Sequence, residues 1–283
     1  MPTRVTVVSD SHLAASNPSA AEQWDAVVDD LTTDPPDLVV HAGDITCDGC
    51  VEPIQLDYAR ELLDRVPGSL VSVPGNHDLG ENSTGPQGYD HVPVHADRLA
   101  RYRSTIGTDR FATTAGMWRI VGANSMLFGT GLPDEADQWA WLESELAPFR
   151  DGGPMALVLH KPLLPPPGQR DGTPRYAPAD ARARLRSLLA GTGGRLVVSG
   201  HIHQSLRHTD SEGLDHLWAP TAWAVLPDDI QSVVGHKIVG VLDLTLHDDG
   251  RVDSAVRVPA GVRQATIGLD VDSPYGELPP LGP

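Results

Sequence analysis

Short runs of β-branched and other apolar residues alternate with amphipathic segments over the first two-thirds of the chain. Apolar runs of this length, bounded by polar clusters, are typical of buried strands. They predict strands over residues 4–8, 37–41, 69–73, 155–160 and 196–199. Because strands alternate with helical segments in layered α/β proteins, this pattern favours an α/β domain.

The segments between these strands carry apolar residues at helical spacing. Trp24, Val28 and Leu31 share one face of a predicted helix, and the run Ser19-Ala20-Ala21-Glu22 resembles a capping box at its start. The same spacing predicts helices over residues 54–62 and 139–146. A proline at the start and a glycine at the end predict a further helix over residues 178–191.

The last third of the chain has a different pattern, mostly of strands. Residues 214–218, 237–246 and 251–258 predict consecutive strands, and residues 111–122 predict an earlier hairpin. No linker long enough to separate two domains is visible. We therefore expect one domain over residues 1–258, followed by a loosely held tail over residues 259–283.

The charge of the chain limits its partners. With 21 Lys and Arg against 38 Asp and Glu, the formal net charge is −17. A surface with this much negative charge does not attract a phosphate backbone or an anionic membrane. We therefore expect neither nucleic acid nor membrane as a partner. The first predicted strand starts too early for a signal peptide, and no apolar run is long enough to span a membrane. We therefore expect a soluble, cytoplasmic protein.

The two cysteines, Cys47 and Cys50, form a single Cys-x-x-Cys pair. One such pair without a second cannot complete a tetrahedral zinc site, so we interpret both residues as loop thiols.

Polar residues follow each of the five early strands. In an open α/β sheet, side chains at the carboxyl ends of the strands meet at one edge, where ligands bind. Carboxylate, imidazole and amide donors suit Mn, Fe or Zn. The donors number more than one tetrahedral ion needs, so the sequence predicts two divalent or trivalent metal ions. The candidate ligands are Asp10, His12, Asp44, Asn76, His160, His201 and His203.

The spacing of these residues supports a common site. Just past a strand end, the two-residue step in Asp10-x-His12 and in His201-x-His203 directs both donors toward one centre. A glycine precedes each of Asp44, Asn76 and His201 and is expected to allow a sharp turn where the backbone leaves the sheet.

With these motifs in this order, the chain resembles the calcineurin-like metallophosphoesterase superfamily. The resemblance covers residues 10–203 and implies a four-layer α/β/β/α sandwich with two mixed β-sheets, the metallophosphoesterase fold. It also implies that Asp44 bridges two ions. One ion would be held by Asp10, His12, Asp44 and His203, and the other by Asp44, Asn76, His160 and His201.

The run Asn76-His77-Asp78 adds candidate catalytic residues. A pair of cations inverts the local charge and so allows an acidic protein to bind a phosphate ester. His77 is expected to donate a proton to the departing alkoxide, and Asp78 is expected to orient its ring. We expect Asn76, His77 and His203 to contact the substrate. Lys161 either contacts a substrate phosphate or lies on a solvated face.

The leading hypothesis is a metal-dependent phosphodiesterase that acts on a small substrate such as a 3′,5′-cyclic nucleotide, as in compact bacterial members that the chain resembles. A phosphomonoesterase acting on a nucleotide or sugar phosphate remains an alternative, because the metals hold only the phosphoryl group. A non-catalytic scaffold is a third reading, although such proteins typically lose ligands or the acid histidine. The sequence leaves the metal, the leaving group and the oligomeric state open.

Overall fold

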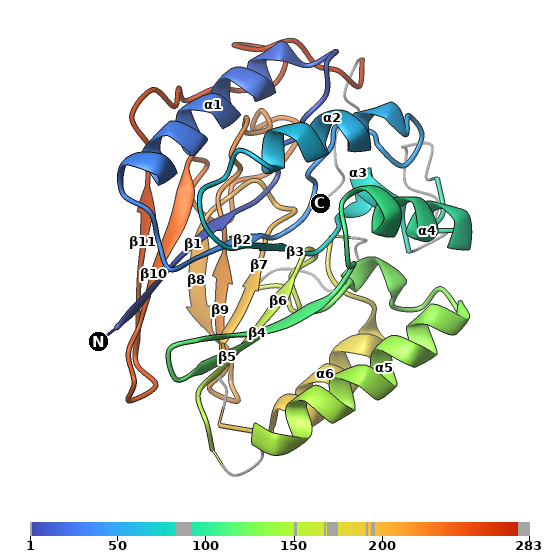
Figure 1. Cartoon of the computed structure of the whole chain (residues 1–283), viewed down its shortest axis with the longest axis vertical. Helices are drawn as coiled ribbons and strands as arrows, with labels where there is room; N and C mark the ends of the chain where they lie inside the picture. The colour runs from blue at the N-terminus through green and yellow to red at the C-terminus, as the bar shows by residue number, and fades with distance from the viewer. Residues whose placement is uncertain are drawn as a thin grey trace.

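The computed structural model describes residues 2–82, 92–149, 152–166, 168, 175–190, 192–193 and 196–276. Within these residues the chain forms two β-sheets that face one another, with helices on both outer surfaces (Figure 1). This arrangement confirms the four-layer α/β/β/α sandwich expected from the motifs.

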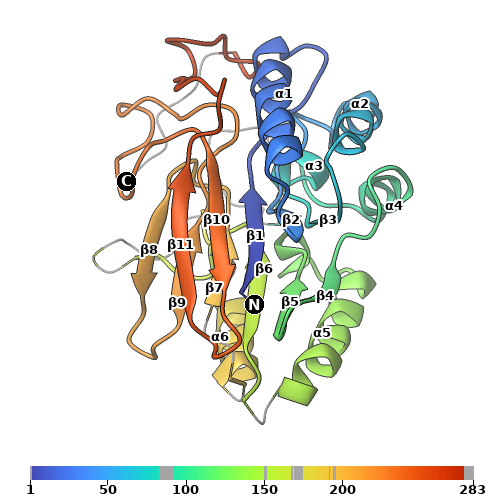
Figure 2. The same ribbon diagram turned by 60° about the vertical axis from the view of Figure 1, so that its left-hand side comes forward.

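The first sheet has the strand order β11-β10-β1-β2-β3 and is mixed. Its strands are β1 (Thr3–Val8), β2 (Leu38–His41), β3 (Leu70–Ser72), β10 (Val241–Leu246) and β11 (Val252–Arg257). The first three are parallel, whereas β10 runs antiparallel to β1, with Val5 opposite Leu244. The chain thus returns from its far end to lie beside its first strand (Figure 2).

The second sheet has the order β4-β5-β6-β7-β9-β8. Its strands are β4 (Phe111–Ala115), β5 (Trp118–Gly122), β6 (Met155–Leu159), β7 (Leu196–Ser199), β8 (Leu206–Thr209) and β9 (Asp215–Trp218). Strands β5, β6, β7 and β9 are parallel, and the predicted hairpin is formed by β4 and β5. Each sheet therefore contains a run of neighbouring parallel strands whose carboxyl ends share one edge.

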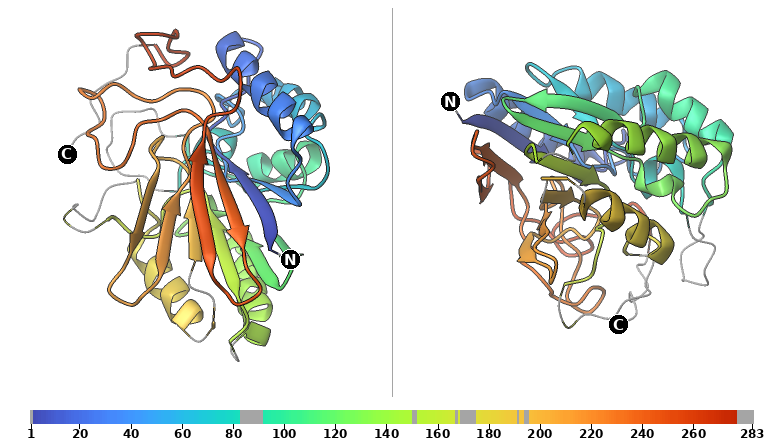
Figure 3. Two further views of the ribbon diagram at one scale, coloured as in Figure 1. Left: turned by 90° about the vertical axis from the view of Figure 1, so that its left-hand side faces the viewer. Right: turned by 90° about the horizontal axis from the view of Figure 1, so that it is seen from below.

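Helices cover the outer face of each sheet. They are α1 (Pro18–Thr33), α2 (Ile54–Leu63), α3 (Asn76–Leu79), α4 (Ala96–Thr105), α5 (Pro133–Leu146) and α6 (Ala179–Ala190), with short 3₁₀ turns at Ser125–Leu127 and Ala147–Phe149. Helices α1 and α2 lie over the first sheet, and α5 and α6 lie together over the second (Figures 1 and 3). None of the helices in the described ranges is long and apolar enough to cross a membrane.

Three apolar layers hold the sandwich together. Val7 and Val198 belong to the layer between the two sheets, Trp24 to the layer under α1, and Leu142 to the layer under α5. All four are at most 1% exposed, so the apolar stripe that predicted α1 is the face that packs on the first sheet. The packing of the two sheets on each other fixes the positions of the strand ends that carry the polar residues.

Some local predictions were wrong. Helix α1 begins at Pro18, so Ser19 lies inside the first turn, and its hydroxyl donates to Oδ1 of Asn17 instead of capping the helix. Proline at the first position sets the helical backbone angle one residue before the predicted start. Strand β10 begins at Val241, four residues after the predicted strand, and α4 and β8 were not predicted.

The segment after β11 is packed over its described part. The backbone N–H groups of Val225 and Ile267 donate to the carbonyls of Ala265 and Val225, both at 2.9 Å, and Ala265 and Ile267 are buried. The side chain of Gln23 on α1 also binds the backbone of Arg263. Arg263 is thus held against α1, and Ala265 and Ile267 are held against Val225, so this part of the segment is packed where a loosely held tail was expected. Residues 277–283 lie outside the described residues.

Candidate metal centre

The candidate ligands all follow strand ends, and the structure brings them together in two groups. One group is Asp10, His12 and His203; the other is Asp44, His160 and His201. Within each group the donor atoms lie within 4.8 Å of one another. Asn76 adjoins the second group, because its Oδ1 lies 3.2 Å from Nε2 of His160.

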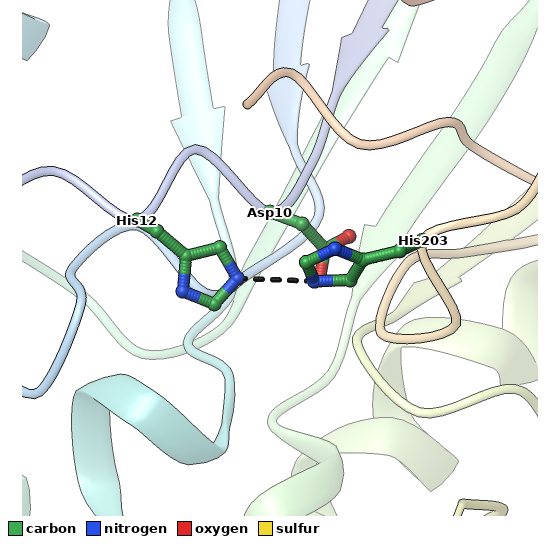
Figure 4. A group of neighbouring side chains, drawn as sticks. All are labelled: Asp10, His12 and His203. Carbon is green, nitrogen blue, oxygen red and sulfur yellow. Dashed lines mark hydrogen bonds and ion pairs between the residues drawn. The ribbon is translucent and has the colours of Figure 1, made fainter. Parts of the chain in front are cut away.

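The first group joins the end of β1 to the loop after β7. Nε2 of His12 faces Nε2 of His203 at 3.1 Å (Figure 4). Oδ1 of Asp10 lies 3.4 Å from the same nitrogen of His203. Nδ1 of His203 donates to the carbonyl of Ala224 at 2.7 Å, which fixes the proton on Nδ1 because a carbonyl only accepts. The Nε2 lone pair is therefore directed toward the other donors.

The second group converges on one nitrogen. Nδ1 of His160 donates to the carbonyl of Ala42 at 2.9 Å. Its Nε2 lies 3.1 Å from Oδ2 of Asp44, 3.1 Å from Nδ1 of His201 and 3.2 Å from Oδ1 of Asn76. Histidines that bind a metal typically donate their outer N–H to a carbonyl in this way. The donors of both groups therefore fit a pair of metal ions.

The electrostatics of these groups also suit cations. Burial alone would raise the pKa of Asp44, but the neighbouring His160, His77 and His12 together hold that pKa well below its ordinary value. Burial lowers the pKa of His160, but the Asp44 carboxylate more than compensates and raises it to about 9. Burial also lowers the pKa of His12 and His201, which keeps both neutral and able to bind a metal. Metal binding at His160 would release a proton.

Backbone strain is concentrated at the same residues. Among the described residues other than glycine, those with positive φ are Asp10, His12, Asp44, His201 and His203. The left-handed conformation costs a residue with a Cβ about 1–2 kcal/mol. All five are candidate ligands, and strain of this kind is typical of functional sites whose surroundings hold it in place. The fold thus keeps these side chains directed into one centre.

The glycines beside the ligands have two different roles. Gly43 has φ of 97° and makes the expected turn before Asp44. Gly75 has φ of −107°, and Gly200 is not among the residues with positive φ, so the prediction of a glycine-dependent turn was wrong for these two. A Cβ at Gly75 would instead collide with the Asp44 carboxylate, and one at Gly200 with the Ser9 hydroxyl. Gly75 thus allows the loops after β2 and β3 of the first sheet to approach closely, and Gly200 allows the strand ends of the two sheets to do so.

His77 lies beside both groups but belongs to neither. Its ring is half-buried, with its centroid 4.8 Å from that of His12. Nδ1 of His77 donates to the carbonyl of Cys47 at 2.6 Å. Since a carbonyl only accepts, Nδ1 carries the proton of the neutral ring and Nε2 is left to exchange one.

Asp78 does not have the expected position. Its carboxylate accepts from the backbone N–H groups of Ile45, Thr46 and Gly75 at 3.1, 2.8 and 2.8 Å, and from the Thr46 hydroxyl at 2.7 Å. At the third position of α3 the side chain turns back toward the start of the helix, away from the ring of the preceding residue. Asp78 therefore joins the loops after β2 and β3, and the Cys47 carbonyl orients His77.

Lys161 is neither a substrate contact nor a solvated residue. Its side chain is fully buried, and its Nζ lies 2.7 Å from Oε2 of Glu81 and 3.1 Å from Oδ1 of Asn82. The ion pair ties the residue after His160 to the segment that follows α3. Cys47 and Cys50 are buried free thiols, which agrees with their interpretation as loop residues.

Replacing Lys161 with Met should lower the free energy of unfolding by about 3–5 kcal/mol, because the Glu81 carboxylate is left buried without its cation. Urea denaturation measures this difference. The control is Arg4→Met, which removes the exposed ion pair with Asp34 and should cost at most about 1 kcal/mol. Glu81→Gln in the Lys161→Met background should recover part of the loss. Equal costs for the two single variants would contradict the buried pair.

One neighbour of the site lies far from every motif in the sequence. The hydroxyl of Tyr275 is 2.7 Å from Nδ1 of His12. Spacing and composition give no signal for this contact, because Tyr275 is 263 residues away and belongs to the segment expected to be a tail.

Known proteins are similar to this chain in sequence and in fold. A sequence model described as calcineurin-like phosphoesterase matches residues 3–205. A cAMP/cGMP dual specificity phosphodiesterase of Mycobacterium tuberculosis is 31% identical over 180 residues, 62% of this chain and 51% of that protein. A glycerophosphodiester phosphodiesterase of Enterobacter lignolyticus is 30% identical over 135 residues, 46% of this chain and 43% of that protein. The chain thus spans about half the length of these curated relatives.

Solved structures are similar in fold at low identity. A dimetal phosphatase from Danio rerio superposes with a TM-score of 0.64 and 17% identity, over 91% of this chain and 97% of that one. A purple acid phosphatase from yellow lupin seeds gives a TM-score of 0.55 and 16% identity, over 93% of this chain and 55% of that one. With a family match that extends from β1 to the end of the loop bearing His201 and His203, the chain belongs to the calcineurin-like phosphoesterase family.

Proposed function

We propose that the protein is a two-metal-dependent phosphoester hydrolase that acts as a phosphodiesterase on a small substrate such as a 3′,5′-cyclic nucleotide. The observation that carries the proposal is the convergence of two groups of carboxylate and imidazole donors, each within 4.8 Å, at the shared edge of the two sheets. Histidine and carboxylate donors with one amide favour Mn, Fe or Zn over softer metals.

Each candidate ligand has a role in this proposal. Asp10, His12 and His203 would hold one ion, His160, His201 and Asn76 would hold the other, and Asp44 would be shared between them. The two donor groups adjoin one another, because the backbone N–H of His201 donates to both oxygens of Asp10, at 3.1 and 3.0 Å. Two bound cations supply Lewis acidity that stabilises charge on the phosphoryl oxygens and makes a nearby water more acidic.

The proton for the leaving group comes from His77 in this proposal. Its Nδ1 is held by the Cys47 carbonyl, so Nε2 is the atom that transfers the proton. General acid catalysis of this kind contributes about 10²–10⁴-fold to a rate. The half-buried ring remains partly exposed, and with Asn76 and His203 it would contact the phosphoryl group of the substrate.

Preference for a diester is supported by the relatives. Both curated relatives are phosphodiesterases by name, one of cyclic nucleotides and one of glycerophosphodiesters. The net charge of −17 adds support, because a monoester carries more negative charge than a diester and is repelled more strongly by an acidic surface.

A substrate panel with added Mn²⁺ tests the proposal. We expect kcat/KM for bis-p-nitrophenyl phosphate to exceed that for p-nitrophenyl phosphate by roughly tenfold or more, about 1.4 kcal/mol of differential transition-state binding. Among natural esters, 3′,5′-cyclic AMP and cyclic GMP should be hydrolysed, and a chelator should abolish each activity. The reverse preference would favour a phosphomonoesterase. Two bound ions with no turnover of any ester would favour a non-catalytic scaffold.

A further inference from the structure

Tyr275 reaches the candidate metal centre from the far end of the chain. It lies beyond residues 3–205, the part that the family model matches. Its hydroxyl is 2.7 Å from Nδ1 of His12, and its ring centroid is 5.0 Å from that of His77. One side chain thus contacts both a candidate ligand and the candidate acid.

The contact with His12 involves the nitrogen that does not face the other donors. Nε2 of His12 faces Nε2 of His203 at 3.1 Å, so metal binding needs its lone pair there and the proton on Nδ1. That proton is then donated to the oxygen of Tyr275. The contact with Tyr275 therefore supports the tautomer of His12 that leaves Nε2 free to bind a metal.

The same C-terminal segment also supports the second histidine of this group. Nδ1 of His203 donates to the carbonyl of Ala224, and the next residue, Val225, is hydrogen-bonded to Ala265 and Ile267 of residues 259–276. Outer hydrogen bonds of this type fix the tautomer and the orientation of a metal-binding imidazole. Both histidines of the group thus have their outer nitrogen held by residues beyond position 205.

We infer that Tyr275 is a positioning residue for the Asp10, His12 and His203 group: its hydroxyl holds the outer nitrogen of His12 in the orientation that metal binding needs, and its ring confines His77. This inference rests on the proposed metal centre and adds to it a requirement for the C-terminal segment.

Tyr275→Phe separates the hydroxyl from the ring. In the full-length protein, calorimetric titration of the metal-free form with Mn²⁺ should show affinity for one of two ions weakened by about 10- to 100-fold, the usual effect of losing an outer hydrogen bond. Affinity for the other ion should be unchanged. The matched control is Tyr58→Phe, in which a half-buried tyrosine on α2 away from the site loses its hydroxyl. Both affinities should be retained there.

Tyr275→Ala removes the ring as well. At saturating Mn²⁺ it should have a lower kcat than Tyr275→Phe, with KM changed less than kcat, because His77 loses the ring packed beside it. Thermal unfolding of the metal-free variants identifies any variant that is misfolded. If Tyr275→Ala is misfolded, the metal titration of Tyr275→Phe alone tests the inference.

If Tyr275→Phe bound each of the two ions with the same affinity as the wild-type protein, the inference would be overturned, whatever the activity of the variant. Equal weakening at both ions would also overturn it, because the hydroxyl touches only the first group. A wild-type protein that binds two ions but hydrolyses no phosphoester would contradict the proposed function and leave this inference standing. The metal titration therefore tests the role of Tyr275, and the substrate panel separately tests the proposed function.

Discussion

Replacing Asp44 with Asn should lower kcat/KM by about 10³-fold and reduce the bound metal from two ions to at most one. The substitution preserves shape and leaves Oδ1 able to accept from the backbone N–H of His77, as it does at 2.9 Å. It removes the negative charge that faces His160. Losing one ion forfeits several kcal/mol of transition-state stabilisation, and about 4 kcal/mol corresponds to the expected change in rate.

Metal analysis and kinetics measured on the same sample test this result. The control is Asp243→Asn, the same chemical change at a half-buried carboxylate of β10 that binds Arg257 and lies outside both donor groups. It should retain two ions and wild-type kinetics, even if it is less stable. An Asp44→Asn protein that keeps both ions at wild-type affinity would contradict the bridging role. Two retained ions with lost activity would place Asp44 in catalysis alone.

The layers of the fold could be predicted from local patterns. Apolar runs such as residues 196–199 predicted β7 because strands buried on both faces read as continuous apolar segments. Helix α4 and strand β8 lacked that signal. Helix α4 buries only Leu99 and Tyr102, a stripe too narrow to stand out in a polar segment, and β8 is an edge strand of four residues.

The site could be predicted in part. The candidate ligands are short motifs at strand ends, and the rule that such ends converge brought them together without any knowledge of contacts. The groups that orient these side chains could not be predicted, because they are backbone carbonyls and side chains distant in the sequence. The carbonyls of Ala42, Cys47 and Ala224 orient three histidines, and a carbonyl has no signature in a sequence.

The misassignment of Asp78 has the same origin. Adjacency in the sequence suggested that it holds His77, but neighbouring residues on a helix point about 100° apart. Its four hydrogen bonds go to backbone and hydroxyl groups of Ile45, Thr46 and Gly75. Lys161 was misjudged for a related reason: lysine is rarely buried, and its partner Glu81 lies 80 residues away.

His77 is the residue whose loss should separate chemistry from metal binding. His77→Ala should lower kcat by about 10²–10⁴-fold for an ester with an alkoxide leaving group, because no other group in the proposal supplies the proton. The metal content should remain that of wild type, since the His77 ring belongs to neither donor group. His236→Ala, which removes an exposed imidazole outside the site, should change neither quantity.

The leaving group sharpens this test. p-Nitrophenolate departs without a proton, so the same variant should lose much less activity on bis-p-nitrophenyl phosphate than on a cyclic nucleotide, whose ribose alkoxide needs one. For each protein, wild type and His77→Ala, we take the ratio of kcat on the cyclic nucleotide to kcat on bis-p-nitrophenyl phosphate. Any loss of folded protein affects both values equally and cancels from this ratio. An equal loss on both substrates would mean that His77 holds the phosphoryl group instead of protonating the leaving oxygen. A parallel loss of metal would make it a ligand.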